Sequence, residues 1–454
     1  MKRAPNPKDW TARYEEALSP KVIKERATVR AVALPSLDAL NVEEACRLLE
    51  LQLKAVFVVT ARCLDIIQLL VGRALAHARL VYADPRSALR AMYDGVSLSE
   101  EPYIPVLITG PAGVGKSKLR EAVARVLPGR REVYVDESHP NVPLNDYELL
   151  VVAGRKSQLE LLRPLASPEV AVGRAKIRQD KIALEAARWQ RFCGCCLLGA
   201  DELQFLSQSA SASTLLTSTM LCLADVRIPW FAMLNYSACW KLLARPAEAG
   251  QRLLKMPVVM HPDAPDSDDW RALMCEYDVV CKKVCAFKLV DKRSELWRLS
   301  AGLKREVVAL LAHAYRLCRM RGAKRFTWTD ILKAYASVEF YASRTDVELL
   351  IAHAAQGGVL SHSLACPFQG KSIEIPEQAY RANLLKAREV KLNRSVLEAA
   401  LNKKEIEAIE GISAASNPVP SPKRPPKKKH KRPTLEALLA AGRRRRQNLG
   451  LAPQ

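Results

Sequence analysis

The sequence of 454 residues predicts an α/β protein with a three-layer α/β/α core, a small helical lid, an N-terminal helical domain and a disordered, basic C-terminal tail. Two observations predict the core. Between residues 99 and 292, short apolar runs alternate with runs of helical periodicity, as is typical of helices covering both faces of a largely parallel sheet. One of these apolar runs leads into a glycine-rich loop of the type that binds phosphate groups.

The glycine-rich loop follows the apolar run 106–109 and precedes a helix-compatible run that ends at Val126. It matches the pattern G-x-x-x-x-G-K-[ST] at every fixed position, which disfavours a plain glycine turn. In this context, backbone N–H groups and the positive end of the helix bind phosphate oxygens. We expect Lys116 to reach the β- and γ-phosphates of ATP and Ser117 to ligate Mg²⁺. The expected phosphate-binding residues are Gly110, Pro111, Ala112, Gly113, Val114, Gly115, Lys116, Ser117 and Lys118.

Two adjacent carboxylates, Asp201 and Glu202, follow the predicted strand 195–199. Such a pair can be an ordinary solvated turn. After a phosphate-binding loop, however, it predicts that Asp201 holds Mg²⁺ through water and that Glu202 orients or deprotonates the attacking water. The pair lies 85 residues beyond Lys116 (201 minus 116), and we ascribe this long spacing to a charged helical insertion between residues 155 and 190.

Two further polar residues are candidates for catalysis. Asn235 ends the predicted strand 228–234, where its amide would hold the attacking water or the γ-phosphate; the alternative is a helix cap. Arg252 begins an apolar segment 17 residues later (252 minus 235). It is either a surface charge or a side chain that reaches the nucleotide of a neighbouring subunit. The remaining expected strands are 131–135 and 149–152.

Helical segments flank the core. Long helices are predicted from Val42 to Tyr82, with Asn41 as a cap, and they would form a platform packed on the core. After the core, the apolar spacing from Val307 to Tyr315 and a capping pattern at Thr327 predict the lid. The expected domains are the N-terminal helical domain 1–98, the nucleotide-binding core 99–292, the lid 293–345, a helical extension 346–410 and the tail 411–454.

Charge predicts a polyanionic partner. Lys and Arg number 70 against 48 Asp and Glu, a formal net charge of +22. Residues 423–446 alone hold 11 Lys or Arg and one Glu. We expect this tail either to bind the phosphates of double-stranded DNA or to recruit a protein through a short helix at 434–441. Arg155 and Lys156 are candidates for DNA contacts within the core, although an ordinary charged turn also explains them.

Composition also bears on the compartment. The 12 cysteines are scattered, and the N-terminus does not combine a charged start with the apolar centre of a signal peptide. The apolar stretch 51–71 is interrupted by Lys54, Arg62 and Asp65, which favours a packed helix over a membrane span. We therefore expect a reduced, cytoplasmic protein without a membrane partner.

The order of these motifs resembles the AAA+ ATPases encoded by transposons, of the TnsC and TniB type. The resemblance spans residues 90–345, and the stretch from Gln251 to Trp270, with Gln-Arg-Leu-Leu and the acidic run from Asp263, is what suggests the transposition branch. The segment 299–306 is similar to the start of the sensor-2 helix, in which either Lys304 or Arg305 would contact the γ-phosphate.

The resemblance implies a bacterial ATPase that hydrolyses ATP to ADP and phosphate and assembles head to tail into rings or helical filaments on duplex DNA. Nucleotide would lie between subunits, with Arg252 supplied by the neighbour. Such assemblies respond to a target-selection protein, recruit the transposase and dissociate after hydrolysis. Two alternatives stay open: an origin-recognition or helicase-loader ATPase with the same motifs, and a scaffold that binds ATP without turnover. The paired carboxylates and Arg252 disfavour the scaffold.

Overall fold

The computed structural model describes residues 9–83, 87, 89–90, 93, 102–127, 129, 131–133, 137–152, 157–207, 212–245, 250, 252–356 and 360–368. All of them belong to one compact unit, Met1–Lys371. The candidate DNA contacts Arg155 and Lys156 and the basic tail 411–454 lie outside the described residues. Among the described residues, every helix is too short or too polar to cross a lipid bilayer.

Five parallel strands form the central sheet in the order β4-β5-β6-β1-β7. Its strands are β1 (Val106–Gly110), β4 (Glu148–Val151), β5 (Leu198–Asp201), β6 (Trp230–Asn235) and β7 (Pro257–Val259). Pairing is in register at the carboxyl ends, where Gly110 lies opposite Asn235 and Val151 lies opposite Asp201. The loops that leave these strands therefore emerge along one edge of the sheet.

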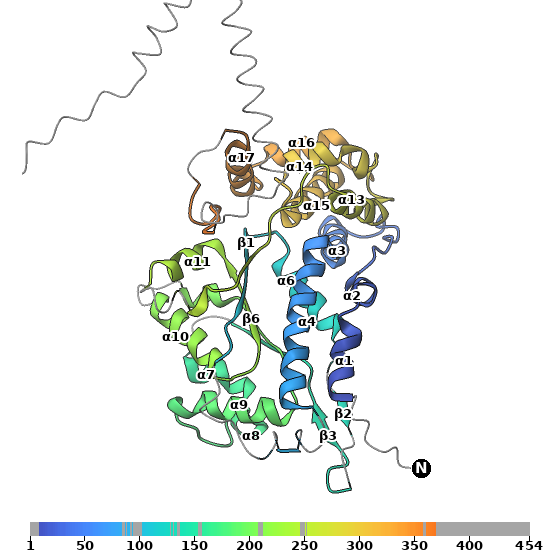
Figure 1. Ribbon diagram of the computed structural model, residues 1–454. Coiled ribbons are helices and arrows are strands. Elements are labelled where there is room, and N and C mark those ends of the chain that lie inside the picture. The colour runs from blue at the N-terminus through green and yellow to red at the C-terminus, as the bar shows by residue number, and fades with distance from the viewer. Residues whose placement is uncertain are drawn as a thin grey trace, which may run out of the picture. The chain divides into compact units, whose positions relative to one another are not determined.

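Helices cover both faces of this sheet (Figure 1). The first face carries α1 (Asp9–Ala17), α2 (Pro20–Ala27), α4 (Ala61–Val81) and α6 (Lys116–Val126). The second carries α7 (Gln158–Leu162), α8 (Pro168–Ala171), α9 (Ile182–Phe192), α10 (Ala212–Ala224) and α11 (Tyr236–Leu243). Side chains of β1 alternate between them, since Ile108 packs on the first face and Leu107 on the second. This arrangement confirms the predicted three-layer core and the helical segment between β4 and β5.

Two strand predictions need correction, and two short strands were not predicted. The run 131–135 was expected in the main sheet, but β2 (Arg131–Val133) pairs antiparallel with β3 (Val142–Leu144) in a separate hairpin. Glu132 is exposed there, so β2 lacks the two apolar faces of a central parallel strand. β5 begins at Leu198 and not at Cys195, because the preceding residues form a turn around Gly194, whose φ is +63°. The short strands β3 and β7 were not predicted.

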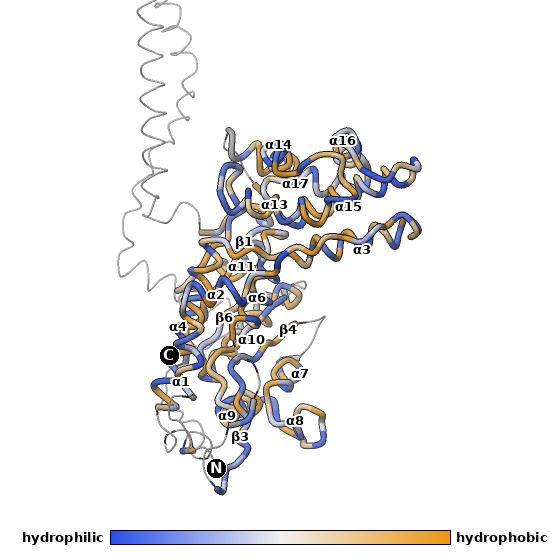
Figure 2. The backbone as a smooth tube through the Cα atoms, turned by 90° about the vertical axis from the view of Figure 1, so that its right-hand side faces the viewer, coloured by the Kyte–Doolittle hydropathy of each residue, from blue (hydrophilic) through white to orange (hydrophobic). Residues whose placement is uncertain are grey.

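A second helical layer forms the lid. It consists of α13 (Asp268–Cys281), α14 (Arg293–Arg298), α15 (Lys304–Met320), α16 (Trp328–Ala336) and α17 (Tyr341–Gln356). The N-terminal helix α3 (Val42–Ala55) joins this layer, and Figure 2 shows it running alongside α15. Leu49 and Leu53 of α3 belong to the same apolar cluster as Leu273 and Leu311. Residues on both sides of the predicted boundaries at 98 and 292 belong to the same apolar clusters. The domain boundaries therefore remain predictions.

Residues 360–368 return from the lid to the core. The indole of Trp240 on α11 donates a hydrogen bond to the carbonyl of Ala365 (3.0 Å) and stacks on the ring of His362, with 5.0 Å between ring centroids. Leu364 is buried beside them. The end of the described chain is thereby fixed to the helix that follows β6.

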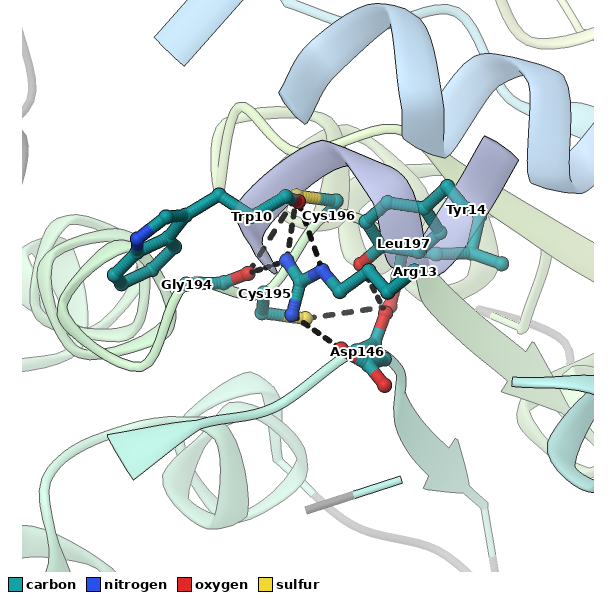
Figure 3. Close-up of polar contacts among 8 residues, drawn as sticks. All are labelled: Trp10, Arg13, Tyr14, Asp146, Gly194, Cys195, Cys196 and Leu197. Atoms are coloured by element: carbon teal, nitrogen blue, oxygen red, sulfur yellow. Dashed lines mark hydrogen bonds and ion pairs between the residues drawn. The ribbon is translucent and has the colours of Figure 1, made fainter. Parts of the chain in front are cut away.

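A buried ion pair ties α1 to the chain that enters the sheet (Figure 3). The guanidinium of Arg13 is paired with the Asp146 carboxylate, and the two side chains are 1% and 0% exposed. Arg13 also donates to the carbonyls of Gly194 (2.8 Å) and Trp10 (3.0 Å). The hydroxyl of Tyr14 donates to the carbonyl of Asp146 (2.9 Å). One side chain thus joins α1 to the residues that precede β4 and β5.

We predict that Arg13→Ala lowers the free energy of unfolding by about 3–5 kcal/mol, because it leaves a buried carboxylate without its counter-charge. Urea denaturation followed by circular dichroism measures the change. The double variant Arg13→Ala/Asp146→Ala is the control, since it removes both charges and should recover part of the loss. A loss below about 1 kcal/mol, the range of an exposed pair, would contradict the assignment.

The burial of His77 makes the stability of the fold depend on pH. His77 on α4 is 3% exposed, and its Nδ1 lies 2.9 Å from the hydroxyl of Tyr103. Burial, assisted by the charges of Arg191 and Arg13, lowers the pKa of His77 to about 3. The folded protein therefore keeps His77 neutral at pH values where the unfolded chain protonates it.

We predict that this histidine destabilises the fold as the pH falls below about 6.5, its unfolded pKa. Between pH 7 and pH 5 the free energy of unfolding should fall by about 2 kcal/mol more in the wild type than in His77→Gln. Parallel urea titrations at the two pH values measure the difference. Equal losses in the two proteins would show that His77 does not contribute.

Candidate functional site

A cavity of about 450 Å³ opens at the carboxyl edge of the sheet, bounded by the core, the lid and the N-terminal segment. Residues singled out by the sequence meet there, and those that line it are Ala112, Gly113, Gly115, Lys116, Ser117, Lys118, Asp201, Glu202, Asn235, Lys304 and Arg305. Gly110, Pro111 and Val114 belong to the same loop and are buried. The parallel register explains this convergence, because the loop after β1 and the ends of β5 and β6 share one edge.

The glycine-rich loop has the backbone that its sequence requires. Gly113 and Gly115 have φ values of +85° and +111°, in the left-handed region that favours glycine. The loop passes directly into α6, so the N-terminal N–H groups of that helix face the cavity edge. The ammonium of Lys116 donates to the carbonyls of Gly110 (2.8 Å) and Pro111 (3.0 Å). Burial lowers the pKa of Lys116 to about 8.

The two carboxylates lie side by side but in different environments. Asp201 is buried at the end of β5, and its Oδ1 accepts a hydrogen bond from the backbone N–H of Glu202 (2.8 Å). Glu202 has a φ of +61°, a strained value for a residue with a side chain. Gln204 donates to its carboxylate. Burial and the adjacent charge of Asp201 raise the pKa of Glu202, which brings it toward the range of a useful general base.

Asn235 does not act as the helix cap that its sequence position also suggested. It occupies the N-cap position of α11, yet its side chain makes no capping hydrogen bond. Instead it lines the cavity, at the strand end that lies opposite Gly110. An amide at this point can orient a water molecule or a phosphate oxygen beside the loop.

The lid contributes two cations at the start of α15. The backbone N–H of Arg305 donates to the carbonyl of Gly113 (3.2 Å), and a Cβ added to Gly113 would lie 3.0 Å from the Arg305 Cβ. Lys304 forms an ion pair with Asp263 (3.2 Å). Arg305 pairs with its neighbour Glu306 (3.0 Å) and remains 58% exposed. Both side chains line the cavity and lie against the phosphate-binding loop, Arg305 beside Gly113 and Lys304 beside Gly115.

The apolar end of the cavity was missed by sequence reasoning. Its wall includes Val56 and Phe57, which follow α3, and Tyr277 and Val308 from the lid. An isolated antiparallel bridge between Phe57 and Val29 holds this stretch extended. The apolar run 56–59 between two capped helices was the available signal, but nothing local to it indicates which cavity it faces. An apolar wall of this kind suits a planar base.

Arg252 lies away from this cavity. It is exposed and lines a separate hollow of about 970 Å³ with Tyr103, Leu221 and Leu253. A side chain that completes a neighbouring subunit's site would have to lie outside its own, so the role predicted for Arg252 stays a prediction. Gln251 lies outside the described residues.

Comparison with known proteins gives distant likenesses. No protein-family model and no curated protein sequence matches the chain. Among solved structures, it is similar to the ORC1 protein of Aeropyrum pernix in complex with DNA, with 16% identity and a TM-score of 0.34 over 56% of this chain and 64% of that one. The chain thus spans less than two thirds of that structure's length.

Two other solved structures show likenesses of the same order. The Aeropyrum pernix ORC2 protein, in its ADPNP–ADP complexes, has 14% identity and a TM-score of 0.39 over 62% of this chain and 67% of that one. The Thermotoga maritima RuvB Holliday junction branch migration motor has 14% identity and a TM-score of 0.31 over 60% and 74%. The function proposed below is supported by the chain's own residues.

We predict that Arg305, and not Lys304, distinguishes ATP from ADP, because the Arg305 side chain lies beside Gly113 and is 58% exposed, whereas Lys304 is 23% exposed and pairs with Asp263. Arg305→Ala should weaken binding of a non-hydrolysable ATP analogue about tenfold or more, the loss of one charged hydrogen bond, and should leave ADP binding nearly unchanged. Lys304→Ala is the matched control. Calorimetric titrations with both nucleotides measure the effects, and a selective loss in Lys304→Ala alone would reverse the assignment.

Proposed function

We propose that the chain is an ATPase of the AAA+ type that hydrolyses ATP to ADP and phosphate with Mg²⁺, and that its nucleotide state controls its assembly on duplex DNA during transposition. One observation carries the ATPase part. A phosphate-binding loop, paired strand-end carboxylates, a strand-end amide and a lid cation all line one cavity.

The residues that line the cavity support binding of Mg²⁺-ATP. At one end, the loop N–H groups, Lys116 and Arg305 offer donors and positive charge to a triphosphate. At the other, Phe57 and Tyr277 offer apolar surface to the base. Between them, the Ser117 hydroxyl and the Asp201 carboxylate are the oxygen donors that Mg²⁺ prefers, with water completing its shell. When bound, the metal would offset the negative charge of the phosphates.

Each of these site residues would have a separate role in hydrolysis. Glu202, with its raised pKa, would orient the attacking water and accept its proton. The Asn235 amide would hold the same water or a γ-phosphate oxygen. Lys116 would stabilise the charge that develops on the transferred phosphoryl group. Arg305 would sense whether a γ-phosphate is present. It belongs to the lid, and its backbone N–H donates a hydrogen bond to Gly113 of the loop, so it joins the loop to a separate helical layer.

Three features support a role on DNA in transposition. The chain carries a net charge of +22, which favours a polyanionic partner. The stretch Gln251–Trp270, which carries the resemblance to transposon ATPases, contains β7 and runs into lid helix α13, and within it Asp263 pairs with Lys304. Arg252 is exposed, as a contact to a neighbouring copy requires. We therefore propose a ring or filament on duplex DNA that responds to a target-selection protein and recruits the transposase.

We predict that Glu202→Gln binds ATP but hydrolyses it at least about a hundredfold more slowly, because it cannot accept the proton. Its assemblies on duplex DNA should outlast those of the wild type. Lys116→Ala should lose ATP binding and, with it, assembly. Phosphate release and electron microscopy of the full chain with DNA, with ATP analogue or ADP, measure these outcomes, and Glu132→Gln on the exposed face of β2 is the matched control.

Several results would count against parts of the proposal. Wild-type turnover in Glu202→Gln would remove the catalytic assignment. Equal assembly with ATP analogue and ADP would leave an ATPase without the nucleotide switch. Binding to one DNA sequence in strong preference to others would favour an origin-recognition or loader ATPase, which would use the same site residues.

A further inference from the structure

An arginine that the proposed mechanism does not use contacts the metal-site carboxylate. Arg120 lies on α6, and its Nη1 is 2.9 Å from Oδ2 of Asp201. Asp201 has a side chain only 6% exposed and Arg120 one 20% exposed, so the pair is largely shielded from solvent. Shielding makes such a charged hydrogen bond stronger than a surface pair.

The position of Arg120 on its helix is specific. Ser117 and Arg120 are three residues apart in α6, so they project from the same face of the helix. Ser117 is one proposed Mg²⁺ ligand and Asp201 is the other. Arg120 therefore links the helix that carries the first ligand to the strand that carries the second, one helical turn behind the metal position.

Arg120 also fixes the direction of the Asp201 carboxylate. Its two oxygens have different partners: Oδ2 takes the guanidinium and Oδ1 takes the backbone N–H of Glu202. A carboxylate has about four acceptor positions, so these two contacts leave lone pairs for water or metal. A carboxylate held at both oxygens cannot rotate away from the metal position without breaking one of the bonds.

The same contacts extend to the proposed catalytic base. Glu202 has a left-handed backbone that costs of order 1–3 kcal/mol and persists only where its surroundings hold it. The hydrogen bond from its N–H to Asp201 is one such restraint. A displaced Asp201 would therefore also release Glu202 from its position.

We propose that Arg120 is a positioning residue for the metal site, which holds Asp201 toward Mg²⁺ and, through Asp201, holds the backbone of Glu202. The inference rests on the proposed ATP site. Arg120 does not line the cavity, so it would act on the metal site only through Asp201. Loss of an outer contact to a metal ligand typically weakens metal binding or activity about 10- to 100-fold.

The test measures how much Mg²⁺ strengthens nucleotide binding. Calorimetric titrations of a non-hydrolysable ATP analogue are made with Mg²⁺ and with EDTA, and the ratio of the two affinities is the Mg²⁺ gain. Arg120→Gln should reduce this gain about tenfold or more while leaving the affinity in EDTA nearly unchanged. Arg120→Lys keeps the charge and should recover part of the gain.

A matched control lies on the same helix. Arg125 donates to the carbonyl of Ala27 (2.9 Å), on the side of α6 that packs against α2. Arg125→Gln should leave the Mg²⁺ gain unchanged, even if it lowers the melting temperature. A melting curve for each variant separates loss of folding from loss of positioning, because a purely structural role for Arg120 would lower the melting temperature without altering the ratio.

The outcomes distinguish this inference from the proposed function. A wild-type protein that shows no Mg²⁺ gain would refute the proposed metal site itself. A normal wild-type gain that Arg120→Gln retains would refute only the role of Arg120. A larger gain in Arg120→Gln would show that Arg120 competes with the metal, which overturns the inference in the opposite direction.

Discussion

The parallel pairing of β1 with β6 and of β4 with β5 is the constraint on which the site depends. Because these strands run in the same direction, the residues that end them meet at one edge, although Gly110 and Asn235 are 125 positions apart in sequence (235 minus 110). A shift of register by one residue would turn Asp201 toward the opposite face of the sheet. The apolar side chains buried on each face set this register, so they position the site residues as well as stabilise the fold.

The need to cover both faces explains why the N-terminal helices are part of the site. A parallel sheet exposes apolar side chains on two sides, and α1, α2 and α4 cover much of the side that α6 leaves open. Arg13 fixes this cover to the chain entering β4 and β5. Once α4 is fixed, the segment that precedes it has to pass the cavity, which is how Phe57 becomes part of its wall.

The sequence predicted what is local and missed what depends on distant contacts. The phosphate-binding loop and the residues ending β5 and β6 follow from patterns of a few residues each. The hairpin position of β2 could not be predicted, because it depends on pairing with Val142–Leu144 and not on a pattern within its own three residues. β7 has three residues and begins with Pro257, too few for a period. The contact of Arg120 with Asp201 joins residues 81 positions apart, which no local pattern encodes.

The chain passes between the apolar cluster of the sheet and that of the lid at several places, and two of these crossings lie beside the cavity. Val56 belongs to the cluster of the lid and Phe57 to that of the sheet, and the second crossing runs from Met260 to Trp270. Arg62 and Ala61, close to the first crossing, bond to Val259 and Asp269, close to the second. If the close-packed clusters move as rigid bodies, motion between them would bend the chain at these crossings and at others, such as that between Ala27 and Leu34. Because residues of both clusters line the cavity, a displacement of the lid relative to the sheet would change the shape of the cavity.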